Sequence, residues 1–491
     1  MTRIAPVDAN PDGRTDISGI CIGGRFQRGR GPVIEIRSPF SDELVGAIAS
    51  ADAADVEDAV SIAHDCFKRT MRRLPVHVRA RILNKAADLL TDRAEDIARC
   101  LTRESGKPIS LSRVECRRGG EILRLAAQSA QFVTGEVVPL DALSGADGRV
   151  GLAMRTPLGV VAAISPFNAP VNLSLQKVAP ALAAGCTVVL KPADPTPHTV
   201  LMLAKIFADA GLPEGALSIL PGAADMARAI VTHPKVAVVS FTGSTAVAEK
   251  IQSAIGIKKV IYELGSNAPN VVCADADLDL AAKSLVASAF NSSGQICVSA
   301  QRIFAHESVY DSLVERMIPL IEALKIGDPM DETVTLGSLI SRAALDRIDS
   351  WVTEAVLQGA TALTGGGRHR LGHNYMPTLL ANVSPQMKVQ CQEVFGPVVT
   401  ISRFQTDEEA VDLCNASPYG LRAGVFTRDL GRAFFYAREL EVGGMSINDT
   451  SRFRQDNTPS SGIKSSGVGQ EGGRYAYEEY TYLKFVALRL G

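Results

Sequence analysis

Four short apolar runs, each followed by an amphipathic stretch of helical length, limit this chain to few folds. The runs are rich in β-branched residues and nearly free of charge, which is typical of strands buried on both faces of a parallel sheet. They are 160–164, 187–190, 236–241 and 260–264, and the amphipathic stretches are 173–184, 198–210, 224–232 and 245–255. This alternation predicts βαβ units wound into an α/β sheet. A second series, with strands near 270–273 and 301–305 and a helix near 278–290, predicts a second α/β unit.

The composition argues against several classes of protein. The 491 residues carry 51 lysines and arginines against 53 acids, and this net charge of −2 argues against a dedicated nucleic-acid binder. Nine cysteines without regular spacing do not describe a disulfide framework. The uncharged run 159–176 could span a membrane, but its prolines and asparagines favour a strand, a loop and a helix start. Since Met1–Asp16 lacks the apolar core of a secretion signal, we expect a cytoplasmic protein without membrane partners.

Two patterns that resemble ligand sites have simpler interpretations. Gly467–Gly472 matches GxGxxG, but only 19 residues follow it, too few for the βαβ unit that this motif opens. We interpret it as a turn-rich loop. Asp275, Asp277 and Asp279 lack the glycine and the final glutamate of a calcium loop, and they predict the N-terminus of a helix. We expect no metal site.

Cys297 is the strongest candidate for a nucleophile. A lone cysteine is more often an inert core residue. Cys297, however, follows a polar stretch with a glycine, 292–296, which gives a substrate access to the sulfur. A catalytic cysteine also needs an activating group and an oxyanion partner, so the assignment depends on other segments.

Polar groups at the ends of the predicted strands supply such partners, at the edge where α/β proteins bind ligands. Asn168 can donate its amide to an oxyanion; the alternative is a turn asparagine. Lys191 and Asp194 suit the hydroxyls of a nucleotide ribose. The segment 241–244 (FTGS) opens a helix whose free N–H groups can hold a pyrophosphate, and Glu263 ends a fourth strand.

Six short motifs occur in an order and spacing that can be compared with those of a known family. They are PFN (166–168), KPAD (191–194), FTGS (241–244), ELG (263–265), GQIC (294–297) and EVFGP (393–397). In order and spacing they resemble the aldehyde dehydrogenase superfamily, from about Ile20 to the end of the chain. The segments ELGSNA, GQICVSAQRI and NDTSRFR most resemble a bacterial branch associated with small polar aldehydes. The resemblance implies a non-acylating, NAD(P)-dependent enzyme with a Rossmann-like cofactor domain, an α/β catalytic domain and a small β oligomerisation arm.

The resemblance also implies roles for single residues. Cys297 matches the nucleophile, Asn168 the oxyanion donor, Glu263 the base that activates water, and Lys177 a lysine of a proton relay. The residues that it implies for cofactor binding are Ser165, Pro166, Phe167, Lys191, Asp194, Gly222, Phe241, Gly243, Ser244, Leu264, Glu393 and Phe395. Where many members have a further relay glutamate this chain has Tyr482, so we expect the relay to lack its acid.

Asp194 predicts the cofactor. It stands where many NAD-preferring members have a glutamate that binds both ribose hydroxyls, and a carboxylate there repels a 2′-phosphate. Aspartate is one methylene shorter, so the contact is looser. We therefore predict NAD, with some use of NADP.

The domain boundaries follow from the same resemblance. We expect the NAD(P)-binding domain in 1–135 and 156–262, the catalytic domain in 263–446, the oligomerisation arm in 136–155 and 470–491, and a substrate-entrance loop in 447–469. The strand-like end of the chain, 478–490, has little nearby to pair with, so we expect it to need another sheet, in a second subunit. A homodimer or homotetramer is expected.

The substrate is predicted from the expected tunnel and its entrance. Candidate substrate contacts are Ala169, Gln176, Ile296, Arg452 and Arg454. Small or polar residues at 169 and 176 replace common aromatic ones, and two arginines spaced by two can face one side of a loop. We predict a short aldehyde with a hydroxyl or an anionic group. The alternative is that the arginines only pair with a loop acid, Asp449 or Asp456.

Two other functions compete with hydrolytic oxidation of an aldehyde. CoA-acylating relatives typically lack the glutamate of ELG, so Glu263 argues against that reaction. A binding or structural protein that keeps the fold without catalysis is disfavoured by the joint presence of Cys297, Glu263, Asn168 and Lys191.

Overall fold

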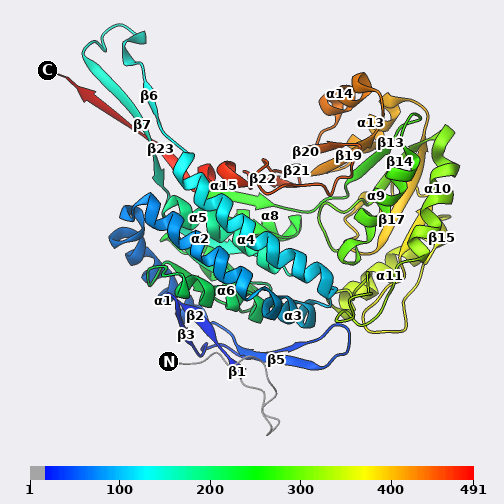
Figure 1. The fold of residues 1–491 in the computed structure, drawn as a ribbon, viewed down its shortest axis with the longest axis horizontal. Helices are drawn as coiled ribbons and strands as arrows, with labels where there is room; N and C mark the ends of the chain where they lie inside the picture. The colour runs from blue at the N-terminus through cyan, green and yellow to red at the C-terminus, as the bar shows by residue number, and fades with distance from the viewer. Residues whose placement is uncertain (1–16, 491) are drawn as a thin grey trace.

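The computed structural model describes residues 17–490 and places them in two sheet-centred lobes and a protruding arm (Figure 1). Met1–Asp16, where the sequence shows no secretion signal, lies outside the described residues. Among the described residues, no helix is both long enough and apolar enough to cross a membrane.

The first lobe is an eight-stranded sheet with helices on both faces. In spatial order its strands are β22 (Gly467–Val468), β12 (Lys259–Glu263), β11 (Val236–Thr242), β8 (Val160–Ile164), β9 (Thr187–Lys191), β10 (Leu217–Ile219), β2 (Ile20–Ile22) and β3 (Arg25–Gln27). Strands β8 to β12 run parallel, and the chain leaves β8 first toward β10 and then, after a return, toward β12. This confirms the doubly wound arrangement and puts its switch point between β8 and β11, where such sheets bind ligands.

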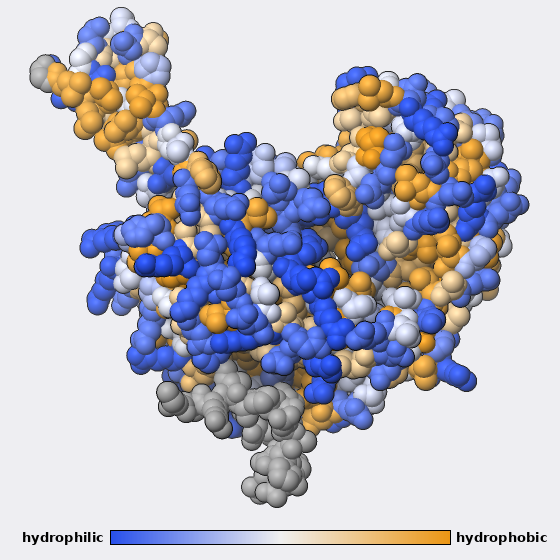
Figure 2. All heavy atoms as spheres, in the orientation of Figure 1, coloured by the Kyte–Doolittle hydropathy of each residue, from blue (hydrophilic) through white to orange (hydrophobic). Residues whose placement is uncertain are grey.

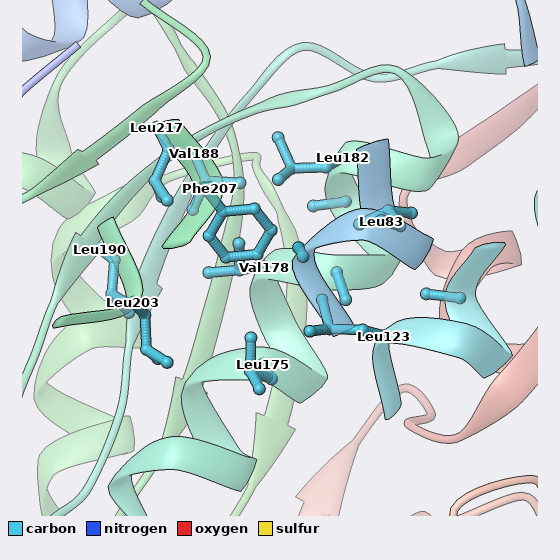
Figure 3. Close-up of a cluster of buried hydrophobic side chains, with 14 of the residues drawn as sticks. Leu83, Leu123, Leu175, Val178, Leu182, Val188, Leu190, Leu203, Phe207 and Leu217 are labelled. Carbon is cyan, nitrogen blue, oxygen red and sulfur yellow. The ribbon is translucent and has the colours of Figure 1, made fainter. Parts of the chain in front are cut away.

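Two hydrophobic layers hold these helices to the sheet. One face carries α1 (Ala53–Arg69), α7 (Ala224–Thr232) and α8 (Thr245–Ile255). The other carries α2 (Val76–Asp92), α3 (Ala94–Ser105), α4 (Ile109–Phe132), α5 (Pro170–Ala184) and α6 (Pro197–Asp209). Figure 3 shows Phe207 of α6 among Val178 and Leu182 of α5 and Val188 of β9. The central strands β8, β9 and β11 are mainly apolar because helices cover both faces of the sheet.

The second lobe has a seven-stranded sheet. Its order is β15 (Thr361–Thr364), β16 (Thr378–Ala381), β17 (Val398–Phe404), β14 (Arg302–His306), β13 (Pro269–Val272), β19 (Arg422–Phe426) and β20 (Gly444–Ile447). Its helices are α9 (Leu278–Phe290), α10 (Glu307–Glu322), α11 (Arg342–Leu357), α12 (Lys388–Cys391), α13 (Asp407–Asn415) and α14 (Leu430–Glu439). Asp277 caps α9 by accepting from the N–H of Leu280 at 3.1 Å, which confirms the helix interpretation of the aspartates.

The arm is a three-stranded antiparallel sheet of β6 (Glu136–Val138), β7 (Arg149–Pro157) and β23 (Thr481–Arg489). The expectation that the last strand lacks a partner in its own chain is wrong, because β23 pairs with β7 from Thr481↔Pro157 to Arg489↔Arg149. Two segments far apart in the sequence thus complete one sheet. The helix before it, α15 (Gly473–Glu479), packs on α4 and α5 of the body. Apolar side chains gather on the outside of the arm (Figure 2), among them Val137, Phe485 and Leu488.

Two smaller sheets complete the fold. One contains β1 (Ile17–Ser18), β5 (Leu44–Ala49) and β4 (Val33–Arg37), and the other pairs β18 (Tyr419–Gly420) with β21 (Ile463–Lys464). The GxGxxG segment contains β22, which joins the edge of the first sheet beside β12. It is followed by the short helix α15 and then by β23, which belongs to the arm and not to the first sheet, so it does not open a dinucleotide-binding βαβ unit.

Candidate active site

Parallel pairing brings the ends of four strands of the first sheet to one edge. Ile164 pairs with Lys191 and with Phe241, and Thr242 pairs with Glu263. The segment that carries Asn168 follows β8 directly. The predicted oxyanion donor, ribose ligands, pyrophosphate segment and base therefore share the carboxyl edge of the sheet, next to the switch point.

The loop that carries Cys297 is built on left-handed backbone. Ser292 and Ser293 have φ of 47° and 57°, and Gly294 has φ of 70°. A Cβ at Gly294 would lie 2.0 Å from the carbonyl oxygen of Gly396, so only glycine fits against the EVFGP segment. Such strained backbone is kept where the surroundings determine it, as at reactive centres. The loop brings the partly exposed Cys297 toward Glu393 and Glu263.

Burial and neighbouring carboxylates raise the pKa values of both the Cys297 thiol and Glu263. Burial raises the pKa of Cys297 to about 12, and the charges of Glu393 and Glu263 add to the rise. Burial likewise raises the pKa of Glu263 to about 8, with a further contribution from Glu471. Glu263 Oε1 is buried and has no hydrogen-bond partner among residues 17–490. The thiol therefore needs a base, and a carboxylate with a free oxygen lies beside it.

Asn168 is held against the nucleophile loop. Its Nδ2 donates to the carbonyl oxygen of Gln295, two residues before Cys297, at 2.9 Å. An amide nitrogen has two N–H donors, so one remains free for a ligand. This contact links the first lobe to the second at the point where an oxyanion would form.

Lys177 has an acidic partner that the sequence analysis missed. Its Nζ lies 2.9 Å from Oε1 of Glu471, and both side chains are almost fully buried. Burial alone would raise the pKa of Glu471, but Lys177 and Arg454 hold it below its usual value. Tyr482 lies on β23 of the arm, 41 % exposed. Lys177 thus has a buried acidic partner despite Tyr482: it is Glu471, which lies inside the GxGxxG segment.

The cofactor residues form a cradle along the sheet edge. Lys191 Nζ donates to Asp194 Oδ1 at 2.6 Å, so the two predicted ribose ligands are in contact. At the start of α8, Ser244 makes no capping hydrogen bond through its side chain, and the buried Thr242 Oγ1 is unpartnered among the described residues. A Cβ at Gly243 would come within 2.5 Å of the Phe241 ring, so the backbone there stays bare. The free backbone N–H groups at the start of α8 can bind a pyrophosphate.

The nicotinamide end of the predicted cradle joins the two lobes. The rings of Phe167 and Phe395 meet edge to face, with centroids 5.9 Å apart. Glu393 Oε1 accepts from the N–H of Ser266 at 3.0 Å, and burial raises the pKa of Glu393 to about 7. The other predicted cofactor residues lie on the first-lobe side: Ser165, Pro166, Gly222 and Leu264 each follow the end of a strand of the first sheet.

The two predicted arginines of the entrance loop, Arg452 and Arg454, differ in exposure. Arg452 is exposed, whereas the side chain of Arg454 is 15 % exposed and reaches Glu471 at 3.6 Å. Arg454 Nε and Nη2 are buried and make no hydrogen bond among the described residues. Arg454 also lies close enough to lower the pKa values of Cys297 and Glu263. The alternative of pairing with Asp449 or Asp456 does not describe Arg454, because its ion pair is with Glu471.

Gln176 supports the entrance loop. The side chain is buried, and Nε2 donates to Asp456 Oδ1 at 3.1 Å. Arg118 binds the same carboxylate through two nitrogens, at 2.9 and 3.3 Å. The Asp456 carboxylate thus accepts hydrogen bonds from side chains of two helices, α5 and α4. The remaining predicted contacts, Ala169 and Ile296, are half-buried, next to Asn168 and Cys297 in sequence.

Comparisons with known proteins agree with this geometry. The model of the aldehyde dehydrogenase family matches residues 26–486. A 3-sulfolactaldehyde dehydrogenase of Priestia megaterium is 42 % identical over 93 % of this chain and 95 % of its own length. A crystal structure of an NAD-dependent aldehyde dehydrogenase from Sinorhizobium meliloti has a TM-score of 0.94 and 35 % identity, covering 99 % of this chain and 98 % of that one. The NADP complex of a glyceraldehyde-3-phosphate dehydrogenase from Bacillus halodurans has a TM-score of 0.94 and 36 % identity, covering 97 % and 100 %.

Proposed function

The chain belongs to the aldehyde dehydrogenase family and oxidises an aldehyde with NAD or NADP; within that activity, we propose that its substrate is a short anionic aldehyde, converted to the carboxylate through a Cys297 thioester. The observation that carries the substrate class is Arg454, whose buried Nε and Nη2 atoms make no hydrogen bond among the described residues and whose charge acts on Cys297 and Glu263. The relatives named for 3-sulfolactaldehyde and glyceraldehyde-3-phosphate support the same class.

The first half of the reaction uses the thiol and the amide. Glu263 takes the thiol proton, which the raised pKa of Cys297 otherwise keeps on sulfur. The sulfur then attacks the aldehyde carbon, and the carbonyl π electrons move onto oxygen. The free N–H of Asn168 and the backbone N–H of Cys297 receive this oxyanion; one such donor is worth about 3–4 kcal/mol in comparable sites.

The cradle residues would hold the dinucleotide. Lys191 and Asp194 would bind the adenosine ribose, Ser244 and the first turn of α8 the pyrophosphate, and Glu393 with Phe395 the nicotinamide end. The chemistry supplied by the bound nicotinamide is acceptance of the hydride from the aldehyde carbon, which leaves a thioester on Cys297. The Asp194 carboxylate disfavours a 2′-phosphate, so NAD is the preferred cofactor.

The second half of the reaction is hydrolysis. Glu263 first releases the thiol proton, which its pKa of about 8 permits in mildly alkaline solution. The carboxylate then takes a proton from water, the resulting hydroxide attacks the thioester carbonyl, and the C–S bond breaks to leave the thiolate and the carboxylic acid. Burial is the main cause of the raised pKa of Glu263; the charge of Glu471 raises that pKa further, and the charge of Lys177 lowers it.

An aldehyde panel tests this function. Purified enzyme is given sulfonated, phosphorylated and carboxylated short aldehydes beside propanal and benzaldehyde, with NAD or NADP, with and without CoA. We expect reduced cofactor without CoA and the highest kcat/KM on the anionic aldehydes with NAD. A strict need for CoA would favour the acylating reaction, and a preference for benzaldehyde would refute the substrate class.

The arm and the compartment complete the proposal. Exposed apolar side chains gather on the three strands of the arm, β6, β7 and β23, among them Val137, Met154 and Phe485. Such a patch suits contact with a second copy of the chain, so we assign the arm to a homo-oligomer. The nine cysteines are free thiols, which suits a reducing cytoplasm.

A further inference from the structure

A second buried lysine–glutamate pair lies outside the residues considered so far. Lys107 follows α3, and Glu115 lies on α4; their side chains are 8 % and 4 % exposed, and the ammonium binds Glu115 Oε2. Neither side chain is among the residues assigned to the reaction. Burying two charges is costly unless each charge finds further partners. The other contacts of Lys107 and Glu115 therefore indicate what the pair does.

Both partners contact the segment that carries Asn168. Lys107 Nζ donates to the backbone carbonyl oxygen of Asn168 at 2.5 Å. Glu115 Oε1 accepts from the N–H groups of Val171 and Asn172, at 2.9 and 3.4 Å. These are first-turn amides of α5, whose N-cap residue, Ala169, makes no capping bond through its side chain. One ion pair therefore clamps the backbone on both sides of the turn between Asn168 and α5.

The turn that contains Lys107 also supports the nucleophile loop. The N–H of Ser338 donates to the carbonyl oxygen of Gly106 at 3.1 Å, and a Cβ at Gly337 would lie 2.1 Å from that oxygen. Ser293 Oγ donates to the carbonyl oxygen of Gly337 at 2.6 Å. The neighbouring Gln295, which accepts the Asn168 amide, donates its own Nε2 to Ser338 O at 3.3 Å. The turn thus touches both segments that meet at the thiol.

We propose that Lys107 and Glu115 are positioning residues that hold the Asn168 amide in register with the Cys297 loop. The inference rests on the oxyanion role given to Asn168 above, and it extends that role to a pair that contacts no substrate. A displacement of about 1 Å in a reacting group can cost about 100-fold in rate. Loss of the clamp should therefore slow the attack on the aldehyde while leaving the cofactor cradle, which the pair does not touch, intact.

A double-mutant cycle tests the coupling. The variant Lys107→Met/Glu115→Gln removes both charges, so that neither is left buried alone, and it is made with and without Asn168→Ala. The measured quantity is the burst rate of reduced cofactor at saturating aldehyde and NAD. We expect the pair variant to lower this rate about 10- to 100-fold in the presence of Asn168, and less than about twofold in its absence. NAD affinity should stay within about twofold throughout.

Two further variants keep the test decisive. Lys107→Arg retains the charge but not the geometry of an ammonium, so it should give a smaller loss that also disappears with Asn168→Ala. Arg124 lies on α4, as Glu115 does, and forms an exposed ion pair with Asp88 at 2.9 Å. The control variant Arg124→Met breaks this pair and should leave the burst rate unchanged.

The outcomes separate the two claims. Equal losses with and without Asn168, or no loss from either Lys107 variant, would overturn the positioning role while the oxyanion role stands. An unchanged burst rate in Asn168→Ala alone would overturn the oxyanion role itself, and the positioning role with it. A pair variant that does not fold leaves the decision to Lys107→Arg, for which the same two criteria apply.

Discussion

The two sides of the cleft around Cys297 are held in different ways. On the sheet side, Asn168 follows β8, and Lys191 and Glu263 end β9 and β12, whose backbone is fixed by hydrogen bonds to neighbouring strands. On the entrance side, the loop between β20 and β21 has backbone bridges to other described segments only near its two ends, at Asp449 and Ser460, and side chains hold the part between them. Ser451 Oγ donates to Val298 O at 2.9 Å, and Arg422 donates to Phe453 O at 2.9 Å.

This difference separates chemistry from selectivity. A sheet edge can present an amide, a base and the cofactor-binding residues in one geometry, because the hydrogen-bonded ladder tolerates little change in its strands. A loop held by side chains can change its residues without disturbing that edge, which is where variation among substrates is accommodated. Substitutions on the sheet side should therefore alter the rate for every aldehyde, and substitutions in the loop should alter the choice among them.

The largest effect is expected at the thiol. Cys297→Ala removes the proposed nucleophilic sulfur and should abolish turnover of every aldehyde, while NAD binding persists because the cofactor-binding residues are unchanged. Turnover by spectrophotometry and NAD binding by fluorescence titration check the two parts. Residual steady-state activity above background would remove Cys297 from the mechanism.

Glu263→Gln should separate the two halves of the reaction. Because glutamine cannot accept the proton of water, steady-state turnover should fall about 100- to 10,000-fold for all aldehydes. A burst of reduced cofactor close to one equivalent should persist but form more slowly, since Glu263 also takes the thiol proton. Stopped-flow absorbance measures both phases, and undiminished turnover would rule out Glu263 as the base.

Arg454→Ala should break the selectivity of the loop. A charge-assisted hydrogen bond contributes about 1.5–3 kcal/mol, so KM for anionic aldehydes should rise roughly 10- to 100-fold while KM for propanal changes little. Arg452→Ala, at an exposed position of the same loop, is the matched control and should change KM by less than about threefold. If both variants affect anionic and neutral aldehydes alike, the loop does not select by charge.

The pH dependence of turnover tests the role of Glu263 on the sheet side. The carboxylate form of Glu263 is the active base and its pKa is about 8, so turnover should fall as the pH drops below that value. The charge of Glu471 helps to raise this pKa, whereas Lys177 and Arg454 lower it. Glu471→Gln should therefore shift the acidic limb of the rate profile to lower pH. A profile that stays in place would show that Glu471 does not act on Glu263.

The smallest effect is expected at the cofactor ribose. Asp194 is 44 % exposed and already paired with Lys191, so solvent weakens its repulsion of a 2′-phosphate. Asp194→Asn should raise the ratio of kcat/KM for NADP to that for NAD by about three- to tenfold. A wild-type enzyme that prefers NADP would overturn the assignment before the variant is made.

Local pattern was sufficient for most of the fold. The strands expected at 160–164, 187–190, 236–241 and 260–264 are β8, β9, β11 and β12 to within about one residue at each end, and the helices between them are present. They were predictable because strands covered on both faces must be apolar along their whole length. The pairing of β23 with β7 was not, because the two strands lie more than 300 residues apart and neither carries a signal for the other.

The amino-acid sequence by itself determined the chemical groups, the strands that end at them and, through six motifs, the family. Only the tertiary structure decided which charges meet. It gave Lys177 the partner Glu471, 294 residues away, and it clamped the Asn168 turn with Lys107 and Glu115. It also buried Arg454 beside the thiol while leaving Arg452 in solvent. The physical reason is that a charge tolerates burial only beside an opposite charge or a hydrogen-bonding partner, and such partners are brought together by packing between elements distant in sequence.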